Sequence, residues 1–316
     1  MKSSFKYALV IIGLSALPLL VASALGILLA RDEITRQATN SLESLASSQK
    51  ARVEQAINQF KIIHDGIASR TQLRNSLEEF NRTHSPEAAS SINRILTDAK
   101  TPFTDIKGVV LLGADGTAVS KLQDETIPSE LYKSLYAKGK TSPALVASGE
   151  SDNQVILHAA PVKRGETLLG VLVLSFLPDH LRSITHTDIG LGRTGETILG
   201  YRDGDGAILF PTRLQTTKET IRITKEQNTT TIQALEKKEV TLSSAKDYRG
   251  QDVLAVTKYI PEADWAIVTK KDRAEIFAPV STFTAIYFFI SIMLLTMAAA
   301  LAWVIAPYIL GAKNRS

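Results

Sequence analysis

Few residues in this chain have side chains that could carry out covalent chemistry. The 316-residue sequence contains no cysteine, which excludes disulfides, thiolate catalysis and thiolate zinc sites. No Gly-x-Ser-x-Gly elbow, Walker loop or kinase signature is present. The histidines form no HExxH-like pair, and His180 and His186, six residues apart, do not share a helical face well. The sequence therefore predicts a protein that is not an enzyme and has neither a metal site nor a cofactor.

Two glycine motifs match known ligand loops in their letters but not in their context. Gly190-x-Gly192-x-x-Gly195 fits the dinucleotide fingerprint, which requires a strand before it and a helix after it. Here a helix is expected before the motif and a strand after it. Asp203-Gly204-Asp205-Gly206 resembles the start of a calcium loop, but its twelfth position is Leu214 where that loop needs a bidentate glutamate. A glycine-rich loop and a hairpin turn are the predicted structures.

Three residues are candidates for binding a small ligand. Tyr132 and Tyr136 lie four apart in a short expected helix and so share one face. His158 is the polar residue inside the apolar strand expected at 155–160. For each, the alternative is a structural role, with the tyrosines covering the core and the histidine hydrogen-bonded within it. A net charge of +4, with basic and acidic residues interleaved, excludes a nucleic-acid patch.

Two long uncharged segments, Tyr7–Ala30 and Ile276–Ala312, lie near the ends of the chain. A membrane-spanning helix needs about 20 apolar residues, and both segments reach that length. Lys2 and Lys6 precede the first segment, and Lys313 and Arg315 follow the second. Because positive flanks stay cytoplasmic, both termini are expected inside and the region between the segments outside. The alternative for the first segment is a cleaved signal peptide, since Ala22-Ser23-Ala24 has the form of a cleavage site.

A helical stripe of apolar or small residues follows the first segment. Its members recur in steps of three and four, which predicts one long helix of about 50 Å that leads away from the membrane. Two shorter helices are expected at 72–80 and 86–100, the second capped by Ser85 before Pro86. The stripe consists of Ile34, Ala38, Leu42, Leu45, Ala56, Phe60, Ile63 and Ile67. It packs on its own domain, forms a dimer seam, or does both.

From Asp105 onward the pattern changes to short strands and tight turns, and it occurs twice. The turns Asp115-Gly116 and Asp205-Gly206 are about 90 residues apart, and each is followed by a short helix and a final pair of strands. Each half is expected to be a small antiparallel sheet with helices on one side, an α+β arrangement. The strands are expected at 106–112, 118–122, 155–162 and 168–176, then at 196–201, 207–210, 252–259 and 265–269, and helices at 128–138, 178–184 and around 233–237.

These features together resemble the double Cache sensor domain of bacterial transmembrane receptors. The resemblance covers about residues 31–280. The residues that carry it are Gly190–Thr197 with Asp205-Gly206, then Tyr248-Arg249-Gly250, Tyr259-Ile260-Pro261 with Trp265, and finally 272–279, which read DRAEIFAP. The resemblance implies a long N-terminal helix and two tandem PAS-like sheet modules, here flanked by two transmembrane helices. It also implies an extracytoplasmic sensor of small ligands, of the chemoreceptor, sensor histidine kinase or diguanylate cyclase type.

The expected domain boundaries follow from the pattern and the resemblance together. Residues 1–30 form the cytoplasmic start and first span, and 31–100 the stalk and helical region. A membrane-distal module occupies 101–182 and a membrane-proximal module 183–275. Residues 276–310 form the second span and 311–316 a cytoplasmic tail.

The resemblance also indicates where a ligand binds. In double Cache proteins the membrane-distal module usually holds it. The amino-acid-binding subclass uses an aromatic and arginine pair and an aspartate near the end of the last strand. The distal module here has no tryptophan, and the strand end reads Ser175, so the acid that recognises an amine is missing and the ligand class stays open. Because of this position, Ser175 is a fourth candidate for binding the ligand.

The link to the membrane is expected at the end of the second module. Trp265 lies in the last strand, and Asp272 is expected to begin a helix that continues through Arg273 into the second span. With only 311–316 beyond that span, the expected cytoplasmic output belongs either to a longer receptor or to a signalling partner, and a homodimer is expected. The alternative function is a doubly anchored structural or assembly protein that binds protein partners without a small ligand.

Overall fold

The chain divides into two units, which are described separately. One contains Met1–Asn40 and Asp272–Ser316, and the other Ser41–Lys271. The computed structural model describes residues 2–122, 129–149, 154–186, 189–215, 219–227 and 229–313. Pro128, expected to start a helix, and Arg315 lie outside these residues.

The first unit consists of helix. Helix α1 (Lys2–Ala68) begins in it, with Pro18 inside the helix, and helix α7 (Arg273–Lys313) makes up the rest. Residues Arg273–Leu301 of α7 have a mean hydropathy of 2.1, and none of their most apolar window is buried. This is the one candidate span in the described part of the chain. The predicted first span is helical throughout, but most of its side chains lie outside the described residues, so it stays a prediction.

The serine and threonine hydroxyl groups of α7 are satisfied inside the helix. Ser281, Thr284 and Ser291 donate to main-chain carbonyls three or four residues earlier, at 2.7–2.8 Å. Without water, a polar group in a hydrocarbon layer must find such a partner internally. The helix can therefore carry these side chains through an apolar environment.

The second unit begins with the rest of α1, in which Leu42, Ala56, Phe60 and Ile67 of the predicted stripe are buried and Leu45 and Ile63 are half-buried. Helix α2 (Thr71–Thr83) follows, and then α3 (Pro86–Lys100). Ser85 Oγ accepts a hydrogen bond from the Ala88 main-chain N–H at 3.1 Å, which confirms the predicted cap. Residues of α1 that are buried in this unit are Leu42, Ala46, Gln49, Val53, Ala56, Ile57, Phe60, His64 and Ile67.

The distal module is a five-stranded antiparallel sheet with the order β2-β1-β5-β4-β3. Helix α4 (Ser129–Gly139) connects its second and third strands, and helix α5 (Asp179–Thr185) follows the last. The predicted strands are confirmed, and β3 at the edge is an addition. The strands are β1 (Ile106–Gly113), β2 (Ala118–Leu122), β3 (Ala144–Ser148), β4 (Val155–Arg164) and β5 (Thr167–Phe176).

The proximal module repeats this order in a six-stranded sheet, β8-β7-β6-β11-β10-β9. The predicted duplication is therefore confirmed, with β8 and β9 as additional strands. A short 3-10 helix η2 (Lys225–Gln227) and helix α6 (Thr230–Leu235) precede β9. The strands are β6 (Glu196–Asp203), β7 (Gly206–Leu209), β8 (Arg222–Ile223), β9 (Thr241–Lys246), β10 (Asp252–Ile260) and β11 (Trp265–Asp272).

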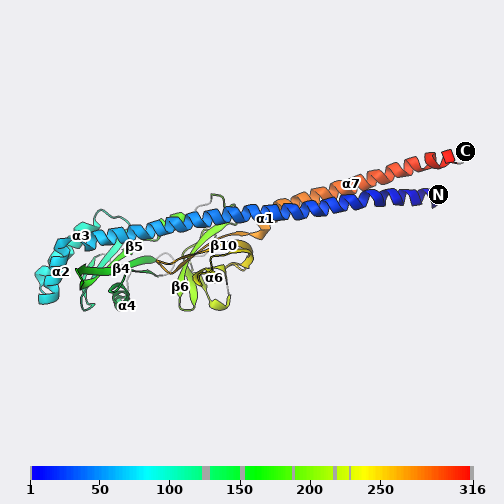
Figure 1. The fold of residues 1–316 in the computed structure, drawn as a ribbon. Coiled ribbons are helices and arrows are strands. Elements are labelled where there is room, and N and C mark those ends of the chain that lie inside the picture. The colour runs from blue at the N-terminus through cyan, green and yellow to red at the C-terminus, as the bar shows by residue number, and fades with distance from the viewer. Residues whose placement is uncertain are drawn as a thin grey trace. The chain divides into compact units, whose positions relative to one another are not determined.

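Two sequence predictions about these modules need correction. Helices cover both faces of the distal sheet rather than one, with α1 to α3 on one face and α4 on the other (Figure 1). Asp272 ends β11 instead of starting a helix, because α7 begins at Arg273. The predicted four-residue turn of the second hairpin, 203–206, is confirmed, with Gly204 at φ 56° and Asp203 paired with Gly206.

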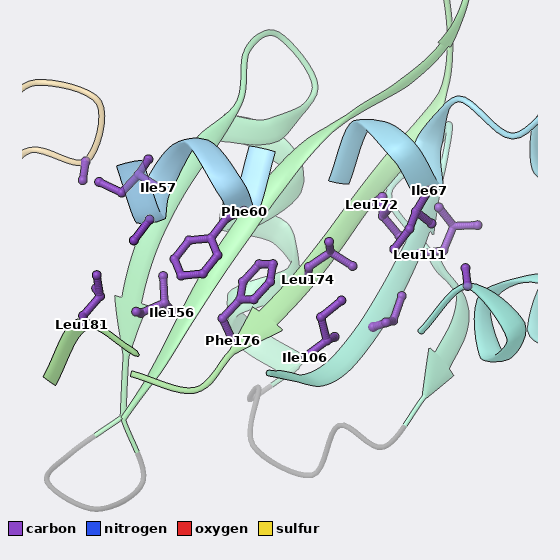
Figure 2. Close-up of a cluster of buried hydrophobic side chains, with 14 of the residues drawn as sticks. Ile57, Phe60, Ile67, Ile106, Leu111, Ile156, Leu172, Leu174, Phe176 and Leu181 are labelled. Atoms are coloured by element: carbon purple, nitrogen blue, oxygen red, sulfur yellow. The ribbon is translucent and has the colours of Figure 1, made fainter. Parts of the chain in front are cut away.

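One apolar cluster runs through both modules. It contains residues of α1, α2 and α3 and one face of each sheet, from Val109 and Leu174 in the distal sheet to Trp265 and Ile267 in the proximal one. Figure 2 shows its centre, where Phe60 of α1 stacks on Phe176 of β5 with ring centroids 4.1 Å apart. The two modules and this part of α1 therefore share a core.

Candidate functional site

The face of the distal sheet beneath α4 is the candidate ligand-binding surface, and we call it the α4 face. Because side chains alternate along a strand, Leu157 of β4 and Val173 and Ser175 of β5 point to this face, while Ile156, Leu172 and Leu174 point to α1. Tyr132 and Leu135 of α4 pack against it. The residues of the α4 face are Val110, Leu112, Val155, Leu157, Ala159, Val171, Val173 and Ser175.

The two candidate tyrosines lie on α4 on the same side, as predicted, but in different surroundings. Tyr132 is buried, and Lys121 Nζ lies 4.6 Å from its ring centroid. Tyr136 is half-buried, its ring packs against Gly116, and its hydroxyl donates to the Ala114 carbonyl. Tyr136 thereby links α4 to the β1–β2 hairpin through a hydrogen bond and a packing contact. Ligand contact by either tyrosine stays a prediction.

Ser175 is the polar group of the α4 face. It is fully buried, and its Oγ has no hydrogen-bond partner among the described residues. On β5 it lies opposite Leu157 of β4 and Gly108 of β1, two residues that offer no side-chain polar group. An unsatisfied buried hydroxyl costs about 1–3 kcal/mol, so the Ser175 hydroxyl would gain from a hydrogen-bond partner.

His158 is not brought together with the tyrosines, because it points to the opposite face of the sheet. It packs edge-on against His64 of α1, with ring centroids 5.0 Å apart. His64 Nε2 lies 3.3 Å from the Leu172 carbonyl oxygen. Burial, and secondarily the nearby His64, lowers the pKa of His158 to about 4. The pair is therefore neutral near pH 7.

The proximal module carries a buried charge cluster on the corresponding face, beneath α6. Lys270 of β11 lies opposite Glu196 of β6, and both are fully buried. Lys270 Nζ is 2.9 Å from Glu196 Oε1 and 2.7 Å from Asp247 Oδ2. These contacts are ion pairs without well-aligned hydrogen bonds. Where the distal module has a lone hydroxyl at the end of its central strand, the proximal module has its own cation and two carboxylates.

The Asp247 carboxylate is held from several directions. Arg249 Nη2 lies 2.8 Å from Asp247 Oδ2, and the main-chain N–H groups of Arg249 and Gln251 donate to Oδ1. Burial raises the pKa of Asp247, but Lys270 and these donors outweigh it and lower the pKa below the usual range. Next to it, burial raises the pKa of Tyr248, whose hydroxyl lies 2.9 Å from Thr212 Oγ1. The cluster is thus a well-connected polar centre.

The sequence analysis did not single out Lys270, Glu196 and Asp247. Lys270 is the first of the charged residues in Lys270–Arg273, which read as a polar junction. The signal that could have found the cluster is the duplication itself. Aligning β11 antiparallel to β6 places Lys270 opposite Glu196 on an inward face.

The predicted junction residues lie along β11 and the start of α7. Trp265 is buried, opposite Tyr201 of β6, and its ring meets Phe210 edge-on at a centroid distance of 5.2 Å. Asp272 is the last residue of β11 and Arg273 the first of α7, so no loop separates strand and helix. The Arg273 guanidinium lies 5.2 Å from the Phe277 ring centroid. A role in signalling stays a prediction for all three.

The described residues contain no group of three or more His, Cys, Asp or Glu side chains that could hold a metal ion. The glycine motif at 190–195 lies between α5 and β6, with Arg213 Nη2 donating to the Arg193 carbonyl at 3.1 Å. This context, a helix before and a strand after, is the reverse of the dinucleotide-binding arrangement. The motif is a loop tied to its own module.

Comparison with known families matches residues 30–280 to dCache_1, described as a Cache domain. Comparison with curated protein sequences gave no significant match. Among solved structures, the ligand-binding domain of the Pseudomonas aeruginosa PAO1 chemoreceptor PctB, in complex with L-Arg, is similar at 15% identity. The TM-score is 0.51, covering 76% of this chain and 97% of that one.

Two further structures have the same fold. The periplasmic sensory domain of the Campylobacter jejuni chemoreceptor Tlp1 is 12% identical, with a TM-score of 0.53 over 78% of this chain and 99% of that one. The ligand-binding domain of Mlp24 with asparagine is 17% identical, with a TM-score of 0.51 over 79% and 98%. At such identities the likeness shows the fold.

Proposed function

We propose, from the premise that this chain belongs to the Cache domain family, that it is a membrane-anchored extracytoplasmic sensor of a small ligand. In this proposal the distal module binds the ligand on its α4 face, and β11 passes the signal to α7. The protein is not an enzyme.

The unpartnered hydroxyl of Ser175 is the observation that carries the proposal. The remainder of the α4 face is apolar, as ligand pockets mostly are, with few polar groups that fix orientation. The matching face of the proximal module is filled by Lys270, Glu196 and Asp247, whose opposite charges pair with one another. This contrast favours the distal module as the ligand-binding one.

The same proposal includes the topology and the partners. Residues 1–30 and 276–310 cross the bacterial inner membrane, 31–100 form the stalk and helical region, and 101–182 and 183–275 are the two periplasmic modules. Both termini, including 311–316, are cytoplasmic. A homodimer passes the signal to a cytoplasmic output, and the hydropathy of α7 supports one of the two spans.

Ligand chemistry follows from the same face. The titles of the PctB and Mlp24 structures record L-Arg and asparagine as ligands of those proteins. The α4 face described here offers a hydroxyl and apolar side chains but no carboxylate to pair with an amine. We therefore propose a small metabolite with an apolar body and a hydrogen-bonding group that meets Ser175.

A thermal-shift screen of the full chain in lipid nanodiscs tests the proposal. A ligand that binds only the folded protein raises its melting temperature. With the metabolite that emerges, Ser175→Ala should weaken binding about fivefold to tenfold, the equivalent of one hydrogen bond. Ser244→Ala, which removes an exposed hydroxyl of β9, is the matched control and should bind normally.

Other outcomes would decide against the proposal. If Lys270→Met rather than Ser175→Ala abolishes binding without unfolding the chain, the ligand sits in the proximal module. If no metabolite shifts the melting temperature while the chain captures a protein partner, the structural or assembly role is correct.

A further inference from the structure

A cavity lies on the α1 side of the distal sheet, away from the α4 face. Its volume is about 490 Å³, which is in the range of small-molecule sites. It is lined by Glu54, Asn58 and Lys61 of α1, Leu145 of the edge strand β3, His158 of β4, and Glu262 of the turn between β10 and β11. We call it the stalk groove. It touches the stalk helix and both modules.

The polar groups of the stalk groove are not used by the protein itself. Among the described residues, Asn58, Lys61 and Glu262 make no hydrogen bond or ion pair. His158 is 4% exposed, and its Nδ1 is buried without a hydrogen-bond partner in the described part of the chain. The ion pair of Glu54 is long, with its Oε1 3.8 Å from Lys50 Nζ. Several polar side chains that line the groove are therefore free to interact with a bound ligand.

The charges of the groove favour a cation. Two carboxylates, Glu54 and Glu262, line it against the single ammonium of Lys61. Burial raises the pKa of Glu54, Lys50 lowers it, and Glu262 and Glu239 raise it further, with a net upward shift. A carboxylate in this situation gains from an added positive charge. Ile57 of α1 and Leu145 supply an apolar wall beside the carboxylates.

We propose that the stalk groove binds a small organic ammonium cation, with the ammonium at Glu54 and Glu262 and the apolar body along Ile57 and Leu145. This site is distinct from the α4 face and requires nothing of a ligand there. Because its lining comes from the stalk helix, the distal edge strand and the proximal turn, an occupant contacts all three. It therefore favours the arrangement in which these elements fit around it.

Saturation-transfer NMR of the full chain in nanodiscs tests this inference with butylammonium as the probe. The neutral 1-butanol and the anionic pentanoate are the matched compounds. Butylammonium should bind, and the other two should bind at least tenfold more weakly. The double variant Glu54→Gln/Glu262→Gln should weaken butylammonium binding at least tenfold.

Two control variants separate the stalk groove from other sites. Glu43→Gln removes an exposed carboxylate from the same helix outside the groove, and it should bind butylammonium normally. Ser175→Ala changes the α4 face and should also bind it normally, so this inference and the proposed function can fail independently. Butylammonium binding that survives the double variant, or binding of pentanoate in preference, overturns the inference, as does the absence of binding.

Discussion

At the scale of single residues, Lys270 forms buried ion pairs with two carboxylates of the proximal module. Removing one partner of a buried ion pair leaves an uncompensated charge and costs about 3–5 kcal/mol. Lys270→Met keeps most of the side-chain volume but strands Glu196, while Arg249 still pairs with Asp247. We expect this variant to lose about that much stability, measured as a large drop in the thermal unfolding midpoint.

Another lysine of the proximal module provides the control. Lys246→Met, at an exposed position of β9, should leave the midpoint nearly unchanged. Adding Glu196→Leu to Lys270→Met should restore part of the lost stability, because it removes the stranded charge. If Lys270→Met alone is as stable as the parent chain, the cluster does not contribute to the stability of the fold.

The two packed histidines predict a pH dependence of stability. Burial lowers the pKa of His64 and takes that of His158 from 6.5 to about 4. Below pH 6.5 the unfolded chain therefore binds protons that the folded chain does not, so protonation favours unfolding. Their contribution is complete above pH 6.5 and is lost as the pH falls toward 4. For His158 the loss is on the order of 3 kcal/mol.

Thermal unfolding between pH 7 and pH 4 measures this effect. His158→Gln should flatten the decline between pH 6.5 and 4, while His84→Gln, at an exposed histidine, should leave it unchanged. Asp247, whose pKa is lowered, adds a separate loss below pH 3.8. An equal slope in His158→Gln and the parent chain would contradict the assignment to this pair.

The role of a residue was predicted correctly from the sequence where neighbouring residues determine it. It was missed where the pairing of distant strands and helices determines it. Ser85 was predicted as a cap because Pro86 and the following helix are local signals. The alternation of β4 places His158 with Ile156 rather than Leu157, but which face meets α1 depends on the packing of a helix about 90 residues earlier. Lys270 is buried only because β11 pairs with β6.

At the scale of elements, the position of α4 above the distal sheet depends on Gly139. A Cβ there would lie 2.8 Å from Val171 Cγ1 and 3.1 Å from Ala159 Cβ. Gly139→Ala should push α4 away from the α4 face and destabilise the chain by about 1–3 kcal/mol, the usual cost of overpacking. It should also weaken ligand binding on that face, measured by the thermal shift the ligand produces.

Gly66 provides the matched control on α1. A Cβ at Gly66 meets nothing within 4 Å, so Gly66→Ala should be neutral or slightly stabilising, because alanine is the better helix former. Unaltered ligand binding and stability in Gly139→Ala would show that α4 does not need this close approach.

Elements with strong periodicity were predicted well, and those at the sheet edges were missed. The two central strand pairs carry long apolar runs, and their bounds agree within a few residues. The edge strands β3 and β9 are half-buried or exposed along their length, and β3 carries only the short apolar run 144–147. β9 also reads as a polar stretch, and only its pairing with β10 defines it. Edge strands take their structure from the neighbour to which they bond.

At the scale of the whole molecule, the duplication gives the two modules one topology but different polar contents. The distal sheet leaves a hydroxyl unsatisfied, and the proximal sheet neutralises its charges internally. A shared apolar cluster joins the modules, so a change in one can reach the other through packing. In the proposed function the proximal module is the transmitter, and its last strand leads directly into α7.

The last prediction concerns that strand-to-helix junction. β11 ends at Asp272 and α7 begins at Arg273, with no flexible linker to absorb a displacement of the strand. Allosteric coupling needs an element that both sites bias, and this junction is the candidate. In a chimera that joins the chain to a reporter kinase, inserting Gly-Gly between Arg273 and Ala274 should abolish ligand-dependent output while ligand affinity stays within about twofold. Each glycine weakens helix continuity by roughly 1 kcal/mol, enough to loosen the junction without unfolding the modules. An Ala-Ala insertion is the control, because it rotates the rest of α7 by the same two residues but keeps the helix rigid. Comparing the two insertions separates the effect of lost rigidity from the effect of this rotation. Ligand-dependent output that persists with Gly-Gly would show that the signal leaves the proximal module by another route.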